Sequence, residues 1–273
     1  MVEKNESLIN KENYKSGSDS MKERIKHSII NQDYSKYISG IYNYCDRWCE
    51  RCSFTSKCAN FSLGNEIWDD TEDLDIQNEK FWKKMGTFFE AISELLVEMA
   101  EEQGIDLNEE MKDAKPREKK FKGHPLAEMA KDYSLSVHQW LKEFHEKYLE
   151  SGEINDKELG DKVDITDAFQ VLQWYSIFIS AKIDRAFFMF EDMDLDDDDN
   201  DVHEYDSNGS AKIAIIAIDR SIGAFSLLLQ HFKNPEEEIK GFLLKLSKVK
   251  QLTLEVFPNA MAFIRPGFDE EGS

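Results

Sequence analysis

All four cysteines of this 273-residue chain lie in one short stretch, YCDRWCERCSFTSKCANF, at residues 44–61. Their spacing is C-x3-C-x2-C-x5-C, at Cys45, Cys49, Cys52 and Cys58. Four thiolates held this closely repel one another unless a cation lies among them, and a bound metal lowers the pKa of each thiol. The expected chemistry is therefore metal binding, with all four cysteines as ligands.

The spacing also bears on which metal is bound. Structural zinc usually binds two C-x2-C turns that a longer loop separates, and here only Cys49 and Cys52 have that spacing. Iron–sulfur clusters use compact cysteine runs, because a cluster is larger than a single ion. We expect a [4Fe–4S] cluster, with structural Zn²⁺ as the alternative and free or redox-paired thiols as a third reading.

Other residues of the stretch have two readings each. Trp48, Phe54 and Phe61 either shield a cluster from water, which tunes its potential, or belong to the ordinary core. Arg47 and Arg51 either offset thiolate charge or are exposed helix charges.

Parts of the stretch resemble motifs of known iron–sulfur proteins. CERCSFTSKC, a C-x2-C-x5-C run, resembles the three-cysteine run that holds a [4Fe–4S] cluster in RecB-like iron–sulfur nucleases and in SPASM domains of maturases. CDRWCERC has the C-x3-C-x2-C spacing of radical SAM enzymes. Those enzymes need repeated βα units, and this chain has helical periodicity throughout. A nuclease is also disfavoured, since no α/β core is visible and the net charge of −21 opposes DNA binding.

The cysteines need an element that positions them, and from Met21 onward the apolar periodicity is helical nearly everywhere. With Ser35 as N-cap, we predict a helix that runs into the cysteines and ends near Ser53. That helix would place Cys45, Cys49 and Cys52 on one face.

Five further helices follow from the same periodicity. They are predicted at residues 77–103, from Pro125 to near Gly152, from Asp164 onward, at 210–232, and from Pro235 to about residue 256. No alternating strand pattern is found. The sequence therefore predicts an all-α bundle of five to six helices with a compact four-cysteine metal site near the N-terminus.

Two segments at the ends of the chain differ from the helices. Residues 1–20 are polar and predict a disordered arm, so residues 21–273 form a single predicted helical domain. Residues 257–273 predict an irregular tail, in which Phe257, Phe263 and Phe268 pin the segment to the body.

A third segment, at residues 191–206, contains ten acidic residues among sixteen. It lacks the glycine and glutamate positions that an EF-hand requires. It therefore predicts a solvated, self-repelling acidic loop, and one that would attract a basic partner.

Two dipeptides, Asp184–Arg185 and Asp219–Arg220, lie inside apolar helical runs. A buried carboxylate is costly unless it is paired. We expect Asp–Arg pairing between the two helices, or else a polar pocket that would make the chain an enzyme. No G-x-S-x-G, P-loop or dinucleotide motif is present, so the question of catalysis stays open.

Charge and hydropathy bear on partners and location. The net charge of −21 disfavours nucleic acid and anionic membrane surfaces, and it suits a redox or basic protein partner. The start of the chain has no apolar signal region. The most apolar run, at residues 213–229, contains Asp219 and Arg220, so a buried helix is expected rather than a membrane span. We predict a soluble cytoplasmic protein, where clustered thiols indicate metal binding.

Three landmarks together resemble a family of uncharacterised bacterial proteins of similar length. They are YCDRWCERCSFTSKC, the IDRSI helix in DSNGSAKIAIIAIDRSIGAF, and the RPGFD tail in FPNAMAFIRPGFDE. The resemblance implies a shared architecture and a shared cysteine site. The expected function is electron transfer or redox or iron sensing through a [4Fe–4S] cluster, and the alternative is a zinc-stapled protein-interaction module.

Overall fold

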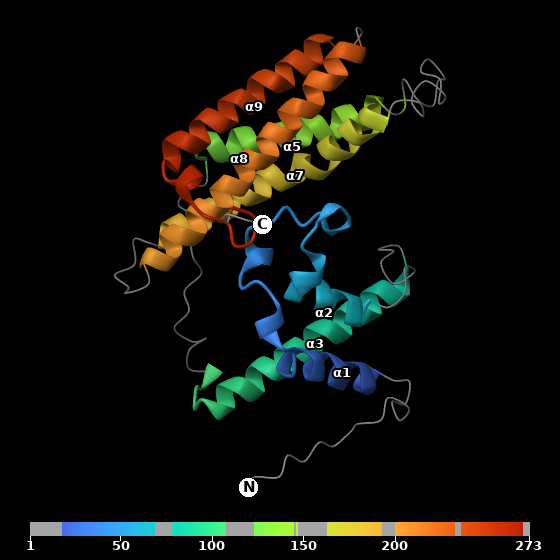
Figure 1. Ribbon diagram of the computed structural model, residues 1–273, viewed down its shortest axis with the longest axis vertical. Coiled ribbons are helices and arrows are strands. Elements are labelled where there is room, and N and C mark those ends of the chain that lie inside the picture. The colour runs from blue at the N-terminus through green and yellow to red at the C-terminus, as the bar shows by residue number, and fades with distance from the viewer. Residues whose placement is uncertain are drawn as a thin grey trace. The chain divides into compact units, whose positions relative to one another are not determined.

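A computed structural model describes residues 18–68, 78–107, 123–144, 146, 163–192, 200–232 and 236–269 (Figure 1). Within these ranges every regular element is a helix and none is a strand, which confirms the all-α class. The chain divides into two compact units. Unit 1 comprises Met1–Ser39 and Cys49–Pro116, and unit 2 comprises Gly40–Trp48 and Arg117–Ser273. The predicted single domain over 21–273 stays a prediction.

Unit 1 contains α1 (Ser18–Ile30), α2 (Ala59–Ile67) and α3 (Glu79–Glu102). The bounds of α3 agree with the prediction because both of its ends are determined locally. The side chain of Asn78 accepts a hydrogen bond from the Lys80 N–H at 3.0 Å, and Gly104 has the left-handed φ of 73° that ends helices.

The core of unit 1 is small. Ile25, Ile67 and Ala91 are buried in it. Two lysines of α1 extend along α3: Lys22 pairs with Glu90 and Glu94, and Lys26 pairs with Glu94 and Glu98. Since later residues of α1 pair with later residues of α3, the two helices run parallel.

Unit 2 is a four-helix bundle of α5 (Pro125–Phe144), α7 (Val163–Asp192), α8 (Asn200–His231) and α9 (Glu236–Val256). Each helix packs against two of the others, in the order α5, α7, α8, α9 and back to α5 (Figure 1). Neighbours run antiparallel, because later residues of one helix contact earlier residues of the next. The cross-helix pairs include Phe144–Phe169, Arg185–Asp206 and Phe225–Phe242.

The centre of the bundle explains the unusual composition of α8. Helices that are apolar on every face are core helices or membrane spans, and Ala211, Ile215, Ile218 and Phe225 of α8 are all buried in the bundle. Among the described residues, the stretch Glu204–His231 is long and apolar enough to cross a membrane, with a mean hydropathy of 1.6. Half of the most apolar part of this stretch is buried inside the fold. The core helix of a helical bundle can have the same length and hydropathy as a membrane span.

The beginning of α8 differs from the sequence prediction. The helix starts at Asn200, ten residues earlier than expected, so residues 200–206 of the predicted acidic loop are helical. Acidic residues in the first turns of a helix are favoured by the helix dipole. In addition, Asp206 pairs with Arg185 of α7. Residues 193–199 of that loop lie outside the described residues.

The described part of the C-terminal tail, residues 257–269, packs on the bundle, as predicted. Phe257 and Phe263 are buried, and the side chain of Arg265 lies over the Phe268 ring at 4.9 Å. A turn at Gly267, with φ of 75°, follows the short 3₁₀ helix at Ala260–Ala262.

Candidate functional site

The cysteine segment is not the continuous helix that the sequence predicted. It consists of 3₁₀ turns at Tyr34–Lys36, Ile41–Asn43, Cys49–Arg51 and Thr55–Lys57. Two left-handed residues interrupt it, Gly40 with φ of 71° and Arg47 with φ of 59°. A left-handed residue cannot continue a right-handed helix, so the prediction of three sulfurs on one helical face is wrong. The N-cap expected at Ser35 is instead provided by Asp33, whose carboxylate accepts from the Ser35 N–H at 3.2 Å.

The C-x2-C pair forms a closed turn. The Cys52 N–H donates to the Cys49 carbonyl at 3.1 Å. Two residues after the second cysteine, the Phe54 N–H donates to Cys52 Sγ at 3.4 Å.

Cys45 has a related environment. Its Sγ lies 3.6 Å from the Tyr42 carbonyl. Burial raises the pKa of the Cys45 thiol, while a hydrogen bond from the Arg47 backbone acts in the opposite direction. Arg47 lies two residues after Cys45, as Phe54 lies two residues after Cys52. Among the described residues, Arg47 is the one non-glycine residue with a positive φ. Such backbone strain persists only where the surroundings impose it.

None of the four cysteines, all of which the structure describes, forms a disulfide, and each is half-buried. Cys45 belongs to unit 2, and Cys49, Cys52 and Cys58 belong to unit 1. Among the residues that the structure describes, which include all four cysteines, no three His, Cys, Asp or Glu side chains are gathered as metal ligands. The predicted four-cysteine metal site is thus not seen as a preformed cage.

Asp46, within the cysteine motif, anchors the segment Gly40–Trp48 to the bundle. Its carboxylate accepts from the Tyr175 hydroxyl at 2.7 Å and from the guanidinium of Arg220. Its backbone carbonyl accepts from the indole N–H of Trp174 at 2.9 Å. Burial, and then the hydrogen bond to the Asp46 carboxylate, raise the pKa of the Tyr175 phenol.

Aromatic packing reinforces this anchor. Trp48 stacks on Trp174 with ring centroids 5.3 Å apart, so the residue directly before Cys49 is held against α7. Tyr44, directly before Cys45, packs on Phe263 at 4.6 Å. A Cβ at Gly209 of α8 would lie 2.5 Å from the Tyr44 ring, so only glycine permits this close approach.

A buried lysine lies beneath the same segment. Lys182 Nζ donates to the Asn43 carbonyl at 3.3 Å. Burial lowers the pKa of Lys182 to about 8, and the cations Arg185 and Arg47 act in the same direction. The sequence did not predict a role at this site for Lys182, Asp46, Trp174 or Tyr175. Asp46 lies more than 120 positions from Trp174 and Tyr175 in the chain. No pattern within a short segment indicates that these residues meet.

Three side chains of the two predicted Asp–Arg dipeptides form ion pairs with residues outside both dipeptides. Arg185 pairs with Asp206 at 2.9 Å and Asp219 pairs with Lys250 at 2.6 Å, while Arg220 pairs with Asp46. Asp184 and Asp219 are exposed, because they lie on helix faces that point away from the core. The expectation that apolar neighbours imply burial of both carboxylates is therefore wrong.

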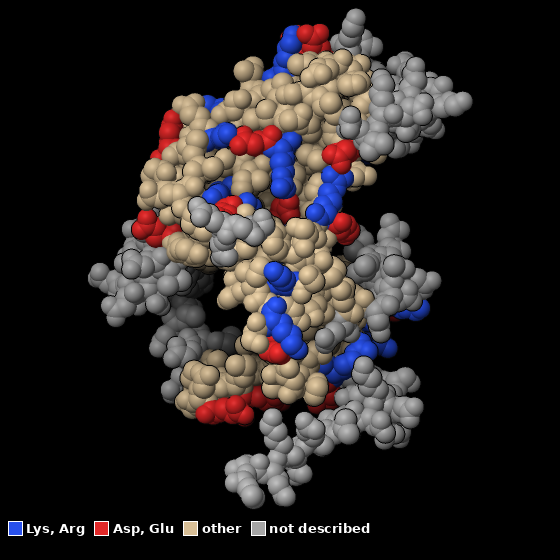
Figure 2. Space-filling model, in the orientation of Figure 1, with Lys and Arg blue, Asp and Glu red and all other residues tan. Residues whose placement is uncertain are grey.

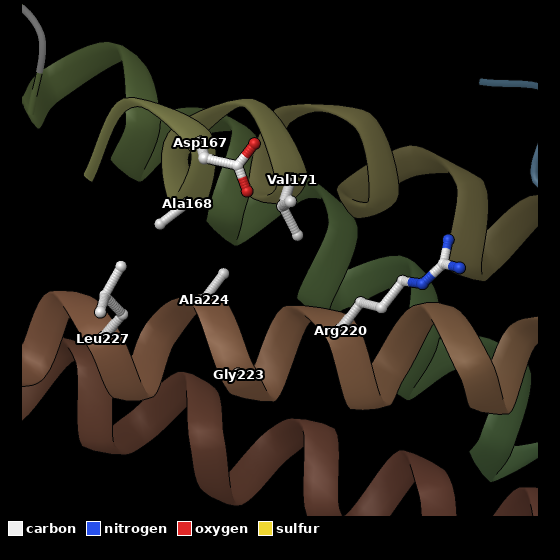
Figure 3. Close-up of a pocket in the computed structure, with 7 residues that line it drawn as sticks. All are labelled: Asp167, Ala168, Val171, Arg220, Gly223, Ala224 and Leu227. Atoms are coloured by element: carbon white, nitrogen blue, oxygen red, sulfur yellow. The ribbon is translucent and has the colours of Figure 1, made fainter. Parts of the chain in front are cut away.

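A groove of about 370 Å³ lies between α7 and α8. Figure 3 shows Ala168, Ala224 and Leu227 facing one another across it, with Arg220 extending to one side. Of the four residues predicted around an enzyme pocket, only Arg220 lines this groove.

Comparison with protein-family models, with curated proteins and with solved structures finds no match to this chain.

Proposed function

We propose that this chain is a metal-binding protein in which Cys45, Cys49, Cys52 and Cys58 hold a [4Fe–4S] cluster for electron transfer or for redox or iron sensing. The observation that carries the proposal is the repeated hydrogen bond to sulfur. At Cys52 the backbone N–H of Phe54 donates to the sulfur at 3.4 Å, and at Cys45 a backbone hydrogen bond from Arg47 opposes the rise in pKa that burial causes. Hydrogen bonds to the ligand sulfurs tune the potential of a cluster that those sulfurs hold.

The residues around the cysteines have supporting roles. Asp46 and Trp48 hold the segment against α7 and α8, so the backbone next to Cys45 is fixed in place. Arg47 brings positive charge next to Cys45. When bound, a cluster with four protein ligands supplies one-electron chemistry and has no open iron for a substrate, which favours electron transfer, sensing or a structural role.

Metal binding requires the thiols to converge, since no three of them are gathered in the described chain. The turns at Cys49–Arg51 and Thr55–Lys57 would rearrange on binding. Coupling of this kind between metal binding and local folding is common, because thiolates seldom gather before the metal arrives.

Structural Zn²⁺ is the second candidate, and one observation favours it. The closed turn from Cys49 to Cys52, with the Phe54 N–H on sulfur, provides a C-x2-C pair of the kind that zinc sites use. In that case the chain would be a zinc-stapled interaction module.

An enzyme with a pocket around Asp184, Arg185, Asp219 and Arg220 has weaker support. Arg185 and Asp219 form ion pairs outside the groove. We propose that the partner is a redox protein or a basic protein, rather than nucleic acid or a membrane, and that the chain acts in the cytoplasm. On the face shown in Figure 2, basic and acidic side chains of the described residues are interspersed.

The test is metal analysis of protein purified without oxygen. A broad absorbance near roughly 400 nm, with about four iron and about four sulfide per chain, is expected for a cluster. Colourless protein with about one zinc per chain would show that the cysteines bind structural zinc and not a cluster. Protein without either metal after reconstitution with both would contradict metal binding altogether.

Replacing each cysteine by serine identifies the ligands. We expect each of the four variants to lose most of the bound metal, because a serine hydroxyl does not provide a thiolate. Ser53→Ala is the matched control, since Ser53 is exposed and lies directly after Cys52. It should retain the metal, and a Cys58→Ser variant with full loading would remove that residue from the ligand set.

A further inference from the structure

The turn from Cys49 to Cys52 places two cysteines at a spacing that a disulfide can bridge. The 3₁₀ helix Cys49–Arg51 is closed by the hydrogen bond from the Cys52 N–H to the Cys49 carbonyl at 3.1 Å. In such a turn the first and fourth Cα atoms lie less than about 7 Å apart, and disulfides join Cα atoms about 4.4–6.8 Å apart. Side chains three positions apart in a 3₁₀ helix also lie on the same side of it. The backbone therefore has the form that a bridge between the two sulfurs needs.

The same turn is open to solvent. Glu50 and Arg51, between the two cysteines, are exposed, and so is Ser53, which follows Cys52. The two cysteines are themselves half-buried. The Phe54 N–H donates to Cys52 Sγ at 3.4 Å, which holds this sulfur against its own turn. A small oxidant in solution can therefore reach the pair.

The other two cysteines have different surroundings. Cys45 belongs to unit 2, whereas the other three belong to unit 1, and its Sγ lies 3.6 Å from the Tyr42 carbonyl. Cys58 follows a second 3₁₀ helix, Thr55–Lys57, and its backbone is extended directly before α2, with φ of −112° and ψ of 114°. The closed turn therefore favours a bridge between its own two cysteines over any other pair.

We propose that Cys49 and Cys52 form a reversible disulfide when the metal-free chain meets a hydroperoxide. The sulfur of one cysteine attacks the O–O bond, which breaks, so that a sulfenic acid forms and the other oxygen leaves as water or an alcohol. The second thiol then attacks the sulfenic sulfur, the S–S bond forms, and the sulfenic oxygen leaves as water. The two thiols lose two electrons and two protons, and one hydroperoxide is reduced.

The size of the loop makes this bridge a reversible one. It closes only the four residues CERC, so it restricts the unfolded chain little and adds little to the stability of the fold. Exposed disulfides of this kind are the labile and regulatory ones. While the pair is oxidised, two of the four proposed metal ligands are blocked. The inference concerns the metal-free chain, so it goes beyond the proposed function and does not depend on it.

The first test maps the disulfide in the full-length chain. The chain is stripped of metal with a chelator, reduced, freed of reductant, and treated with a stoichiometric amount of hydrogen peroxide. Remaining thiols are alkylated before digestion with trypsin, which cleaves after Arg47, Arg51 and Lys57 and so places each cysteine in a different peptide. Mass spectrometry should find WCER joined to CSFTSK, with Cys45 and Cys58 alkylated. Dithiothreitol should release both peptides with free thiols.

Cysteine variants of the metal-free chain show whether the link needs this pair. Cys49→Ser and Cys52→Ser should each lose the linked peptides completely, because neither variant has two thiols in the turn. Cys58→Ser is the matched control, and it should give the link at the wild-type yield, since Cys58 lies outside the turn. Far-UV circular dichroism verifies that every variant is folded.

Four results would overturn the proposal. They are a link that includes Cys45 or Cys58, a link between two chains on a non-reducing gel, four alkylated thiols after peroxide treatment, and loss of the link in Cys58→Ser. Metal analysis separates the disulfide from the proposed function. A chain that forms the link but never binds iron or zinc would contradict metal binding alone, and a chain that binds metal but forms no link when metal-free would contradict the disulfide alone.

Discussion

At the scale of single residues, the centre of the cysteine motif is determined by three side chains with different roles. Arg47 adopts a left-handed conformation that non-glycine residues rarely take. Asp46 and Trp48, on either side of it, are held by α7 through a hydrogen bond and ring stacking. The tertiary contacts of the two neighbours therefore impose the backbone of the residue between them.

This reasoning gives a prediction for Arg47. Arg47→Gly should raise the free energy of unfolding by about 0.5–1 kcal/mol, because glycine takes positive φ without steric cost. Arg47→Val should lower it by about 1–2 kcal/mol, since a β-branched residue is poorly tolerated there. Urea denaturation measures both changes. Equal stabilities for the two variants would mean that position 47 is not left-handed.

At the scale of elements, α8 shows how two glycines in one helix differ. The ring of Tyr44 lies against Gly209, where a Cβ would come within 2.5 Å of it. At Gly223 a Cβ would meet nothing within 4 Å. The first glycine makes room for the segment before Cys45, and the second only reduces helix propensity.

The two alanine substitutions should therefore have opposite signs. Gly209→Ala should destabilise the protein by about 1–3 kcal/mol through overpacking, and Gly223→Ala should stabilise it by about 0.5–1 kcal/mol. Thermal and urea denaturation of both variants provide the comparison, with each serving as control for the other. If Gly209→Ala were as stable as Gly223→Ala, Tyr44 would not pack on α8.

At the scale of the whole molecule, the C-terminal tail is tied to the bundle by one acidic residue. Asp269 pairs with Lys212 of α8 at 2.7 Å and with Arg265 at 2.7 Å. Hydrogen bonds from the Arg265 side chain, and then from Lys212, hold the pKa of Asp269 well below its usual range. A lowered carboxylate pKa contributes stability above the unfolded-state pKa of about 4, and that stability is lost as the pH falls toward the folded-state pKa.

The sign of the pH dependence can be measured with Asp269→Asn. At pH 7 the variant should be less stable than the wild type by about 1–2 kcal/mol. The difference should shrink as the pH falls below about 4, because the wild-type carboxylate then approaches its protonated state. Asp219→Asn, which removes an exposed pair with Lys250, should change stability by less than about 1 kcal/mol at any pH. A stability difference at Asp269 that stayed constant to low pH would contradict the lowered pKa.

Much of the fold was predictable because its signals are local. The bounds of α3 follow from Asn78 and Gly104, and α9 begins directly after Pro235. The set of four cysteine ligands was likewise predicted from the spacing of the cysteines in the chain, and metal binding by them remains a prediction. These features depend on residues a few positions apart, so periodicity and capping rules reach them.

The shape of the cysteine segment and the choice of charge partners were decided only by the tertiary structure. Arg220 binds Asp46, 174 positions away, whereas the sequence suggested partners in the neighbouring dipeptide. The predicted helix through the cysteines is replaced by turns because Tyr44, Asp46 and Trp48 each make contacts on the bundle. Which face of α3 was buried depended on α1 in the same way. Pairing and burial are properties of packed surfaces, and a pattern within one segment does not specify the surface that packs against it.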